Sequence, residues 1–445
     1  FRWLLTTTIA SQVAPVELAM IERNKDGNFY GYIENVTVDG INYHRDFSGI
    51  QTQLAGALSR VEDLADKIED LQQGDIGGIN YQLERLRLTK RRYQLDQQLT
   101  TVIANELVLQ KENLTAQYQV LERQLFEYRG QMNRDQMVVR DMRGELVTIN
   151  IADVLAVDYP NAMNLWQKTG YWFSAIGGFI SDDPREANTE GGVFPAIFGT
   201  IFMVMLMAVI VTPFGVVAAI YLHEYAKKGP ITKFVRIAVI NLAGVPSVVY
   251  GVFGLGFFVY VLGGSIDSLF YPESSPAPVF GTPGVLWSAL TLAILTLPVV
   301  IVSTEEGLSR IPTALRQGSL ALGATKAETL WKIIIPMASP AIMTGLILAV
   351  ARAAGEVAPL MLVGVVKMAP TLPLDGNFPF FHLDRKFMHL GFHIYDVGFQ
   401  SPNVEAARPL VFATAFLLVT VIISLNISAI GIRNHLREKY RSLEG

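Results

Sequence analysis

The sequence predicts a mainly α-helical, polytopic membrane protein with an external domain, in which a small β platform carries a helical coiled-coil hairpin. Hydrophobic residues make up 51% of the 445 residues, and the mean hydropathy is +0.33. Both values exclude an ordinary soluble protein. Charge is unevenly distributed, because residues 1–190 hold 46 Asp, Glu, Lys and Arg side chains and the longer remainder holds only 30. The remainder also contains apolar stretches of about 20 residues, the length that a membrane-spanning helix needs.

The first 190 residues are predicted to contain the hairpin. An apolar repeat runs from Ile50 to Leu71 with alternating spacings of four and three residues, which is typical of a coiled-coil seam. The glycine-rich segment 72–80 is expected to turn the chain, and a second helical run continues to about residue 143. This pattern predicts an antiparallel hairpin over about 46–143, with a shorter first arm and a longer second arm.

Short β segments are predicted on both sides of the hairpin. Residues 16–23 and 28–38 are rich in β-branched and aromatic side chains around Asp26-Gly27, a dipeptide typical of a β-hairpin turn. Residues 145–157 are expected to form a further strand pair. No cluster of catalytic residue types stands out in this half, so a spacer or assembly role is favoured over an enzymatic one.

The second half is predicted to span the membrane five times. Apolar around most of their circumference, these stretches are typical of lipid-embedded helices rather than amphipathic surface helices. Most of them contain Gly or Pro, which membrane helices tolerate. The predicted spans are 193–222, 235–262, 284–304, 337–366 and 409–432.

The charges of the connecting loops predict the orientation. Loops 223–234 and 305–336 and the tail after residue 432 carry Lys and Arg, whereas loop 263–283 carries neither. Because basic loops stay in the cytoplasm, the C-terminus is expected to be cytoplasmic and residues 1–190 to lie outside. This topology leads us to expect one further membrane helix upstream of Phe1.

Loop 305–336 is predicted to be a compact elbow. A short helix meets Gly323, a residue that turns at low steric cost, and a second short helix is expected to end at Pro336. The small residues Gly318 and Ser319 allow another surface to come close. On spacing alone, an ordinary amphipathic connector explains this loop equally well.

The elbow resembles the EAA loop of ABC importer permeases. That family has Glu-Ala-Ala, three residues, Gly, nine residues and Ile-x-Leu-Pro; here the matching positions begin with Gln317 in place of Glu, and Ile333-Ile334-Ile335-Pro336 closes the motif. In the family this loop docks on the ATPase subunit. The resemblance therefore implies an ATPase-coupling surface formed by Gln317, Gly318, Ser319, Gly323, Ile333, Ile335 and Pro336.

Further segments narrow the resemblance. Residues 220–230, 243–255 and 349–362 resemble phosphate-specific permeases of the PstA type, and the long external domain is similar to the enlarged first external loop of one subgroup. The resemblance implies the type I ABC importer permease fold in a bacterial inner membrane, with residues 1–190 periplasmic. It also implies three partners: a cytoplasmic ABC ATPase dimer, a second related permease and a periplasmic phosphate-binding protein.

Arg352 and Glu356 are the ionisable residues deep within the predicted spans. A charge in the bilayer costs about 2.5–3.5 kcal/mol on insertion scales, so these two mark a candidate site. At i and i+4 they can pair on one helical face, and a planar guanidinium suits phosphate oxygens. By resemblance Arg352 matches the arginine tied to phosphate passage. A purely structural ion pair between helices is the alternative.

Other classes of chemistry find little support. The chain contains no Gly-Lys dipeptide, which a phosphate-binding P-loop requires, so a partner must hydrolyse ATP and the chain itself is not an enzyme. His389 and His393 have a spacing that can seat a metal on a helix, but we expect neither a metal nor a cofactor. With a net charge of −4, nothing indicates nucleic-acid binding.

The sequence therefore predicts a permease subunit of an ATP-driven importer that moves inorganic phosphate into the cytoplasm by alternating access. One alternative is the same kind of subunit for another anion or small solute. A second alternative, from a different class, is a membrane-anchored coiled-coil protein for assembly or sensing.

Overall fold

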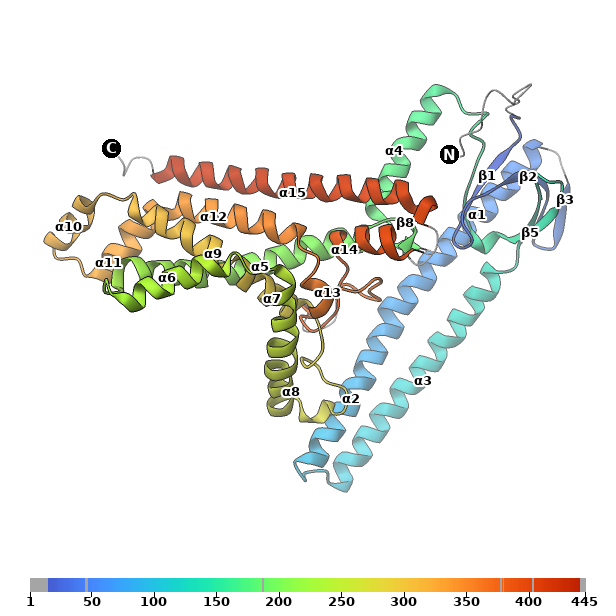
Figure 1. Ribbon diagram of the computed structural model, residues 1–445. Coiled ribbons are helices and arrows are strands. Elements are labelled where there is room, and N and C mark those ends of the chain that lie inside the picture. Colours follow the sequence, from blue (N-terminus) through green and yellow to red (C-terminus); the bar gives the residue numbers. More distant parts are fainter. Residues whose placement is uncertain are drawn as a thin grey trace. The chain divides into compact units, whose positions relative to one another are not determined.

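The computed structural model describes residues 15–44, 47–185, 188–376, 378, 380–401 and 404–440. It consists of two compact units, Phe1–Phe179 and Ile180–Gly445 (Figure 1). Their boundary falls before the predicted domain boundary at residue 190. Each unit has its own core and is described separately below.

The first unit contains a six-stranded antiparallel sheet of order β5-β4-β2-β1-β6, with β3 also paired to β2. The predicted hairpin around Asp26-Gly27 is confirmed, since β1 and β2 pair antiparallel on either side of it and both residues adopt positive φ values, 64° and 68°. The strands are β1 (Ala19–Arg23), β2 (Phe29–Val38), β3 (Ile41–His44), β4 (Gln136–Asp141), β5 (Leu146–Asn150) and β6 (Val154–Asp158).

Two sequence predictions about this sheet are wrong. Residues 136–141 were assigned to the long helix, yet they form β4, whose side chains Met137 and Val139 alternate into the core and are fully buried. The strands of 145–157 do not pair with each other, because β5 pairs with β4 and β6 pairs with β1. Local propensity cannot reveal these partners, which lie far away in the sequence.

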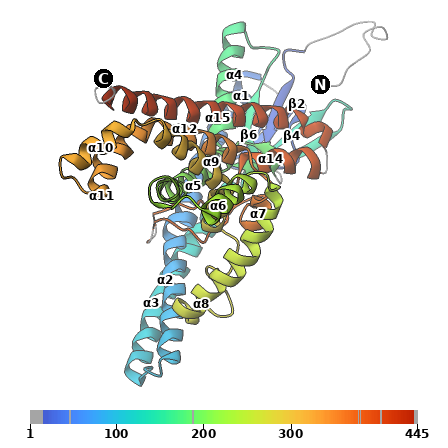
Figure 2. The same ribbon diagram turned by 60° about the vertical axis from the view of Figure 1, so that its left-hand side comes forward.

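The helical hairpin exists, but its turn is displaced from the predicted position. Helix α1 (Phe47–Glu69) continues through a wide π-helical segment (Asp70–Ile76) into α2 (Gly77–Leu95), and the chain reverses only between α2 and α3 (Thr101–Met132). Both views show α2 and α3 side by side (Figures 1 and 2). The glycines do not break the arm because Leu71, Ile76 and Ile79 around them are buried.

The apolar repeat of α1 has two roles. Its first half, including Ile50, Leu54, Ala57 and Val61, belongs to the same buried cluster as the strand residues Ile21 and Val36, so it packs on the sheet. The rest of the arm meets α3. A repeat that looks like one coiled-coil seam therefore serves two different surfaces.

A helix that the sequence reading did not anticipate, α4 (Leu165–Ser181), ends near the boundary between the units. None of its residues is buried, and large side chains including Trp166 and Phe173 are exposed. A two-stranded sheet of β7 (Pro184–Arg185) and β8 (Glu190–Gly191) follows.

The second unit contains five helices that are long and apolar enough to cross a membrane, among the residues that the structure describes. Their number agrees with the prediction. They cover Phe194–Tyr225, Ser247–Phe270, Val285–Ser309, Lys326–Gly355 and Ala407–His435.

The boundaries of two spans differ from the prediction. Residues 230–242 form a separate helix, α6 (Pro230–Leu242), and the second span begins only at Ser247, after Pro246. The fourth span begins earlier than predicted and ends at Gly355, and residues 360–363 form the separate short helix α13 (Leu360–Val363). Pro359 is consistent with this end, because in a continued helix it could not donate to the carbonyl oxygen of Gly355 and its ring would clash with that carbonyl.

Three helices form the centre of the unit: α5 (Phe194–Ile220), α9 (Val285–Ser309) and α12 (Ile335–Gly355). Met207, Leu292 and Val300 are fully buried between them. At Gly345 the helices approach so closely that a Cβ there would lie 2.7 Å from the Cβ of Ser303. The remaining helices are α7 (Ser247–Phe253), α8 (Gly264–Phe270), α10 (Thr313–Ala321), α11 (Lys326–Thr329), α14 (Leu390–Tyr395) and α15 (Val404–Tyr440).

Candidate functional site

The elbow between α9 and α12 is built as two short helices joined by a tight turn. Helix α10 ends before Gly323, whose φ of +88° favours glycine, and α11 starts with a capping box in which Thr325 and Glu328 satisfy each other's backbone N–H groups. The buried hydroxyls of Ser319 and Thr329 lie 2.9 Å apart and join the two helices. The elbow is therefore internally fixed rather than a loose connector.

Charged groups attach the elbow to the ends of two spans. Arg316 donates to the carbonyl oxygen of Leu308 at 2.7 Å, and its guanidinium lies 3.1 Å from the carboxylate of Glu224. Lys326 donates to the carbonyl oxygen of Glu224 and lies 4.2 Å from the centre of the Tyr225 ring. Glu224 and Tyr225 belong to the π-helical end of the first span (Tyr221–Tyr225). A movement of the elbow must therefore move the ends of α5 and α9 as well.

The predicted coupling residues occupy different environments. Gln317, Gly318 and Gly323 are exposed, and a Cβ on either glycine would meet nothing within 4 Å. Ser319 is buried within the elbow, whereas Ile333, Ile335 and Pro336 are half-buried beneath it. The exposed residues can contact a partner, and the others hold the elbow's shape.

Two large exposed side chains on the elbow were not predicted from the sequence. Leu322, which directly precedes Gly323, is 91% exposed, and Trp331 is 73% exposed. Exposed apolar side chains of this size are available for contact with a partner. In the sequence, the signal for them is a Leu and a Trp placed among the charged and small residues of 316–332.

The prediction that the second short helix ends at Pro336 is wrong. Helix α11 continues through a π-helical turn (Leu330–Ile334) directly into α12. Pro336 therefore lies inside a helical run, directly after the π-helical turn, and its missing N–H leaves one gap in the hydrogen-bond ladder without ending the helix. The elbow and α12 therefore form one continuous helical lever from Lys326 to Gly355.

Arg352 lies in the last turn of this lever, and Glu356 lies just beyond it. The helix ends at Gly355, and Glu356 is already extended, with φ −79° and ψ 131°. The two side chains nevertheless pair, with Arg352 Nε 3.6 Å from Glu356 Oε1. The sequence spacing thus predicted this ion pair, although the two residues do not share one helical face. A cation at a helix C-terminus is also stabilised by the helix dipole.

The guanidinium of Arg352 is partly exposed and only loosely paired with Glu356. Among the described residues, Glu356 is the only carboxylate recorded within ion-pair distance, and the Arg352 side chain is 33% exposed. At 3.6 Å the pair is too long for a normal hydrogen bond, so an anion with better geometry can compete with Glu356.

A second buried charge lies outside the spans, in the segment between α13 and α15. Asp396 is 1% exposed and pairs with Lys367 at 3.1 Å. Nearby, burial lowers the pKa of His393 to about 4, an effect that Lys367 increases and Asp396 opposes. Burial also lowers the pKa of His389 to about 4. In the part of the chain that the structure describes, no group of three or more candidate metal ligands comes together.

Comparison with known protein families gives a match over residues 211–442 to the family described as binding-protein-dependent transport system inner membrane component. This match covers more than half of the chain. The chain belongs to this family. It is therefore an integral membrane permease of the ABC importers, a non-catalytic subunit whose ATP is hydrolysed by a partner ATPase.

Individual relatives agree with this assignment. The permease is 32% identical to the phosphate transport system permease protein PstA 1 of Mycobacterium tuberculosis, over 60% of this chain and 77% of the relative. It is also 32% identical to the probable phosphate transport system permease protein PstA of Methanocaldococcus jannaschii, over 42% of this chain and 60% of that protein. A solved structure of the MetNI methionine ABC transporter matches 54% of this chain and 94% of its own, at 17% identity and a TM-score of 0.40.

Proposed function

We propose that this permease carries inorganic phosphate into the cytoplasm and that Arg352 binds the anion on its way. The observation that carries the proposal is the partly exposed guanidinium at the end of α12, whose recorded ion pair among the described residues is a long one to Glu356. Arginine offers a fork of N–H donors that matches phosphate oxygens. The phosphate-transport names of the relatives above support this substrate.

Glu356 has a defined part in this proposal. When no anion is present, its carboxylate neutralises Arg352 and lowers the cost of keeping a charge near the membrane interior. When phosphate arrives, it replaces Glu356 on the guanidinium. The ion pair thus opens when an anion binds to Arg352. Sulfate is the natural competitor, because its size and geometry are similar to those of phosphate.

The lever from Lys326 to Gly355 supplies the mechanical connection. An ABC ATPase dimer in the cytoplasm docks on the exposed elbow residues, including Gln317, Leu322 and Trp331. Closure of that dimer pushes on the elbow, and the continuous helix transmits the movement to Arg352. A second related permease completes the pore, and a periplasmic phosphate-binding protein delivers the anion.

The orientation follows from the loop charges, with the elbow and the C-terminus in the cytoplasm and residues 1–190 in the periplasm of a bacterial cell. The helical hairpin of α1, α2 and α3 then lies in the external part and is available for contact with other components. Its predominantly exposed surface on α3 suits a spacer or assembly arm.

Purification from native membranes followed by reconstitution tests this function. We expect an ATPase, a second permease and a phosphate-binding protein to accompany the chain, and the vesicles to accumulate radiolabelled phosphate when ATP is supplied. Preferential uptake of sulfate or another solute over phosphate would assign the permease to a different substrate. Purification without any ATPase would favour an assembly or sensing role.

A further inference from the structure

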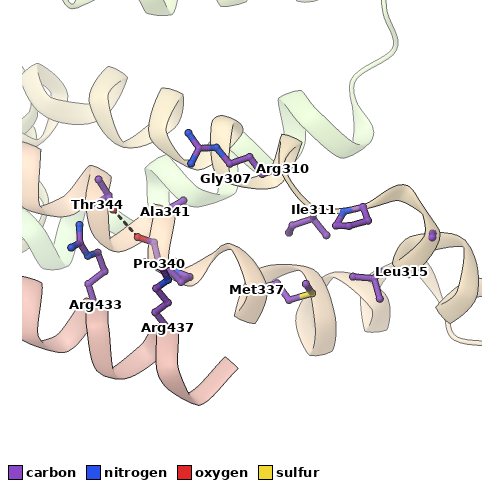
Figure 3. A pocket seen from close by; sticks show the side chains of 12 residues that line it. Gly307, Arg310, Ile311, Leu315, Met337, Pro340, Ala341, Thr344, Arg433 and Arg437 are labelled. Atoms are coloured by element: carbon purple, nitrogen blue, oxygen red, sulfur yellow. Dashed lines mark hydrogen bonds between the residues drawn. The ribbon is translucent and has the colours of Figure 1, made fainter. Parts of the chain in front are cut away.

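A basic pocket lies between the elbow and the last helix, apart from Arg352. Its volume is about 780 Å³, and its lining combines apolar residues such as Ile311, Leu315 and Met337 with arginines. Figure 3 shows that Arg433 and Arg437 reach from α15 toward Pro340 and Thr344 of α12. Arg310, at the end of α9, is the third basic residue of the lining. We call this cavity the arginine pocket.

The two α15 arginines that line the pocket lie at the end of the last candidate span. Ile422 and Leu425 of α15 pack against the central cluster of the unit. Arg433 lies further along the helix on the same face as these residues, and Arg437 lies one turn after Arg433. The face of α15 that is apolar over most of its length thus becomes basic where it borders the pocket.

These charges are poorly satisfied within the described part of the chain. Arg433 donates to the amide oxygen of neighbouring Asn434 at 3.4 Å, and Arg310 lies 3.9 Å from Glu306, with both side chains mostly exposed. Ion pairs of this exposed kind contribute little. No carboxylate of a described residue is recorded in an ion pair with Arg433 or Arg437. An anion from outside the chain would therefore find three cations facing one cavity.

The pocket also lies where lipid headgroups are found. Its residues on α9 and α15 lie close to the ends of two candidate spans, which finish at Ser309 and His435. Such helix ends mark the boundary between hydrocarbon and water. Basic pockets between membrane helices on the cytoplasmic side are suited to acidic phospholipid headgroups.

We propose that the arginine pocket binds an acidic phospholipid, with the phosphodiester on Arg433 and Arg437 and the acyl chains on the apolar lining. A soluble anion would use the arginines but leave the apolar walls in contact with water. A lipid satisfies both, because its charged and apolar parts match the two parts of the lining. The bound lipid would fill the space between the elbow and α15. Binding does not depend on which solute the permease carries.

The test measures lipid binding by the full-length protein, purified in the complex that it forms in native membranes. Phosphatidylglycerol is titrated into the delipidated complex, and bound lipid is counted by native mass spectrometry. A Lys or Arg near an anionic membrane surface contributes about a five-fold gain in affinity. The Arg433→Gln/Arg437→Gln variant should therefore bind phosphatidylglycerol at this site about 25-fold more weakly.

Matched variants separate charge at this site from charge in general. Arg433→Lys/Arg437→Lys keeps both charges and should retain binding within a few-fold, which also shows that the helix end tolerates substitution. Lys227→Gln/Lys228→Gln removes two charges from another predicted cytoplasmic loop and should leave binding unchanged. Phosphatidylcholine, which carries no net charge, should not compete.

Three results would overturn the proposal. Equal phosphatidylglycerol binding by the wild-type protein and the Arg433→Gln/Arg437→Gln variant would exclude the pocket as the lipid site. Displacement of the lipid by millimolar inorganic phosphate would identify a site for soluble anions. Loss of the ATPase from the variant complex with lipid binding intact would identify a protein-docking surface. Because none of these readouts is uptake, the outcome is independent of the test of phosphate transport.

Discussion

The ion pair between Arg316 and Glu224 offers the sharpest test of how the elbow is attached. Both side chains are largely shielded, with exposures of 19% and 12%, and their charged atoms lie 3.1 Å apart. Exposed pairs contribute about 0.2–1 kcal/mol, whereas removal of one partner of a fully buried pair costs about 3–5 kcal/mol. This partly shielded pair falls between these limits, so we expect a coupling energy of about 2 kcal/mol.

Four proteins make a double-mutant cycle for this pair: wild type, Arg316→Gln, Glu224→Gln and the double variant. Arg316→Gln should cost the most, because it also loses hydrogen bonds to the carbonyl oxygens of Leu308 and Ile311. The double variant should cost about 2 kcal/mol less than the sum of the single variants. Equilibrium unfolding in mixed micelles measures these free energies.

The same variants should also change function. An elbow that is loosened from the end of α5 transmits less movement, so more ATP should be hydrolysed for each solute molecule imported. Strict additivity of the two single substitutions would refute the attachment that the structure shows. Unchanged ATP use per imported solute in the Arg316→Gln variant would refute its role in transmission.

Three further predictions concern packing and pH. Gly345→Val places new atoms against Ser303, because even a Cβ at residue 345 would lie 2.7 Å from that side chain. The substitution should therefore reduce the yield of assembled complex. A normal yield would show that α9 and α12 separate easily. Leu54 is 3% exposed, so Leu54→Ala should lower the free energy of unfolding by about 2–5 kcal/mol. The control Leu109→Ala, at a site 66% exposed, should change that free energy by less than about 0.5 kcal/mol. Equal effects of the two substitutions would contradict the packing of α1 on the sheet. Because burial lowers the pKa of His393 from 6.5 to about 4, the unfolded chain binds this proton first as the pH falls, and stability should decrease between pH 6.5 and 4 by up to about 3 kcal/mol. His393→Gln should flatten the pH dependence by that amount, and an unaltered pH profile would contradict it.

The membrane half follows closely from its sequence because the bilayer imposes a strong constraint on length and apolar character. The five spans were predictable for that reason, and Gly323 marked the turn of the elbow. The ends of the spans were not predictable, since they depend on local breaks such as Pro246 and Pro359. Pro336 led to the opposite error, because the helix continues through this proline after a π-helical turn.

In the external half, the periodicity of apolar residues does not determine which surfaces pack together. The repeat from Ile50 onward indicates one buried face but not its partner, and the first part of that face packs on a sheet. Strand β4 was hidden because its partner β2 lies about a hundred residues earlier. Helix α4 was not predicted, although its apolar and aromatic residues are evident in the sequence.

Within the candidate site, sequence spacing brought Arg352 and Glu356 together, but the helix between them ends at Gly355. A Cβ on Gly355 would meet nothing within 4 Å, so the helix is not closely packed at this point. Close approach occurs at Gly345 instead. The attachment of Arg316 to Glu224 joins residues far apart in the chain, and no local pattern reveals it.

The most direct test of the central claim is uptake of radiolabelled phosphate by the reconstituted complex carrying Arg352→Gln, with Arg352→Lys as its matched control. Loss of charge-assisted hydrogen bonds worth about 3 kcal/mol lowers anion binding roughly 100-fold. We therefore predict that the Gln variant assembles with its partners but does not import phosphate, and that the Lys variant retains part of the activity. Normal phosphate uptake by an assembled Arg352→Gln complex would contradict the account.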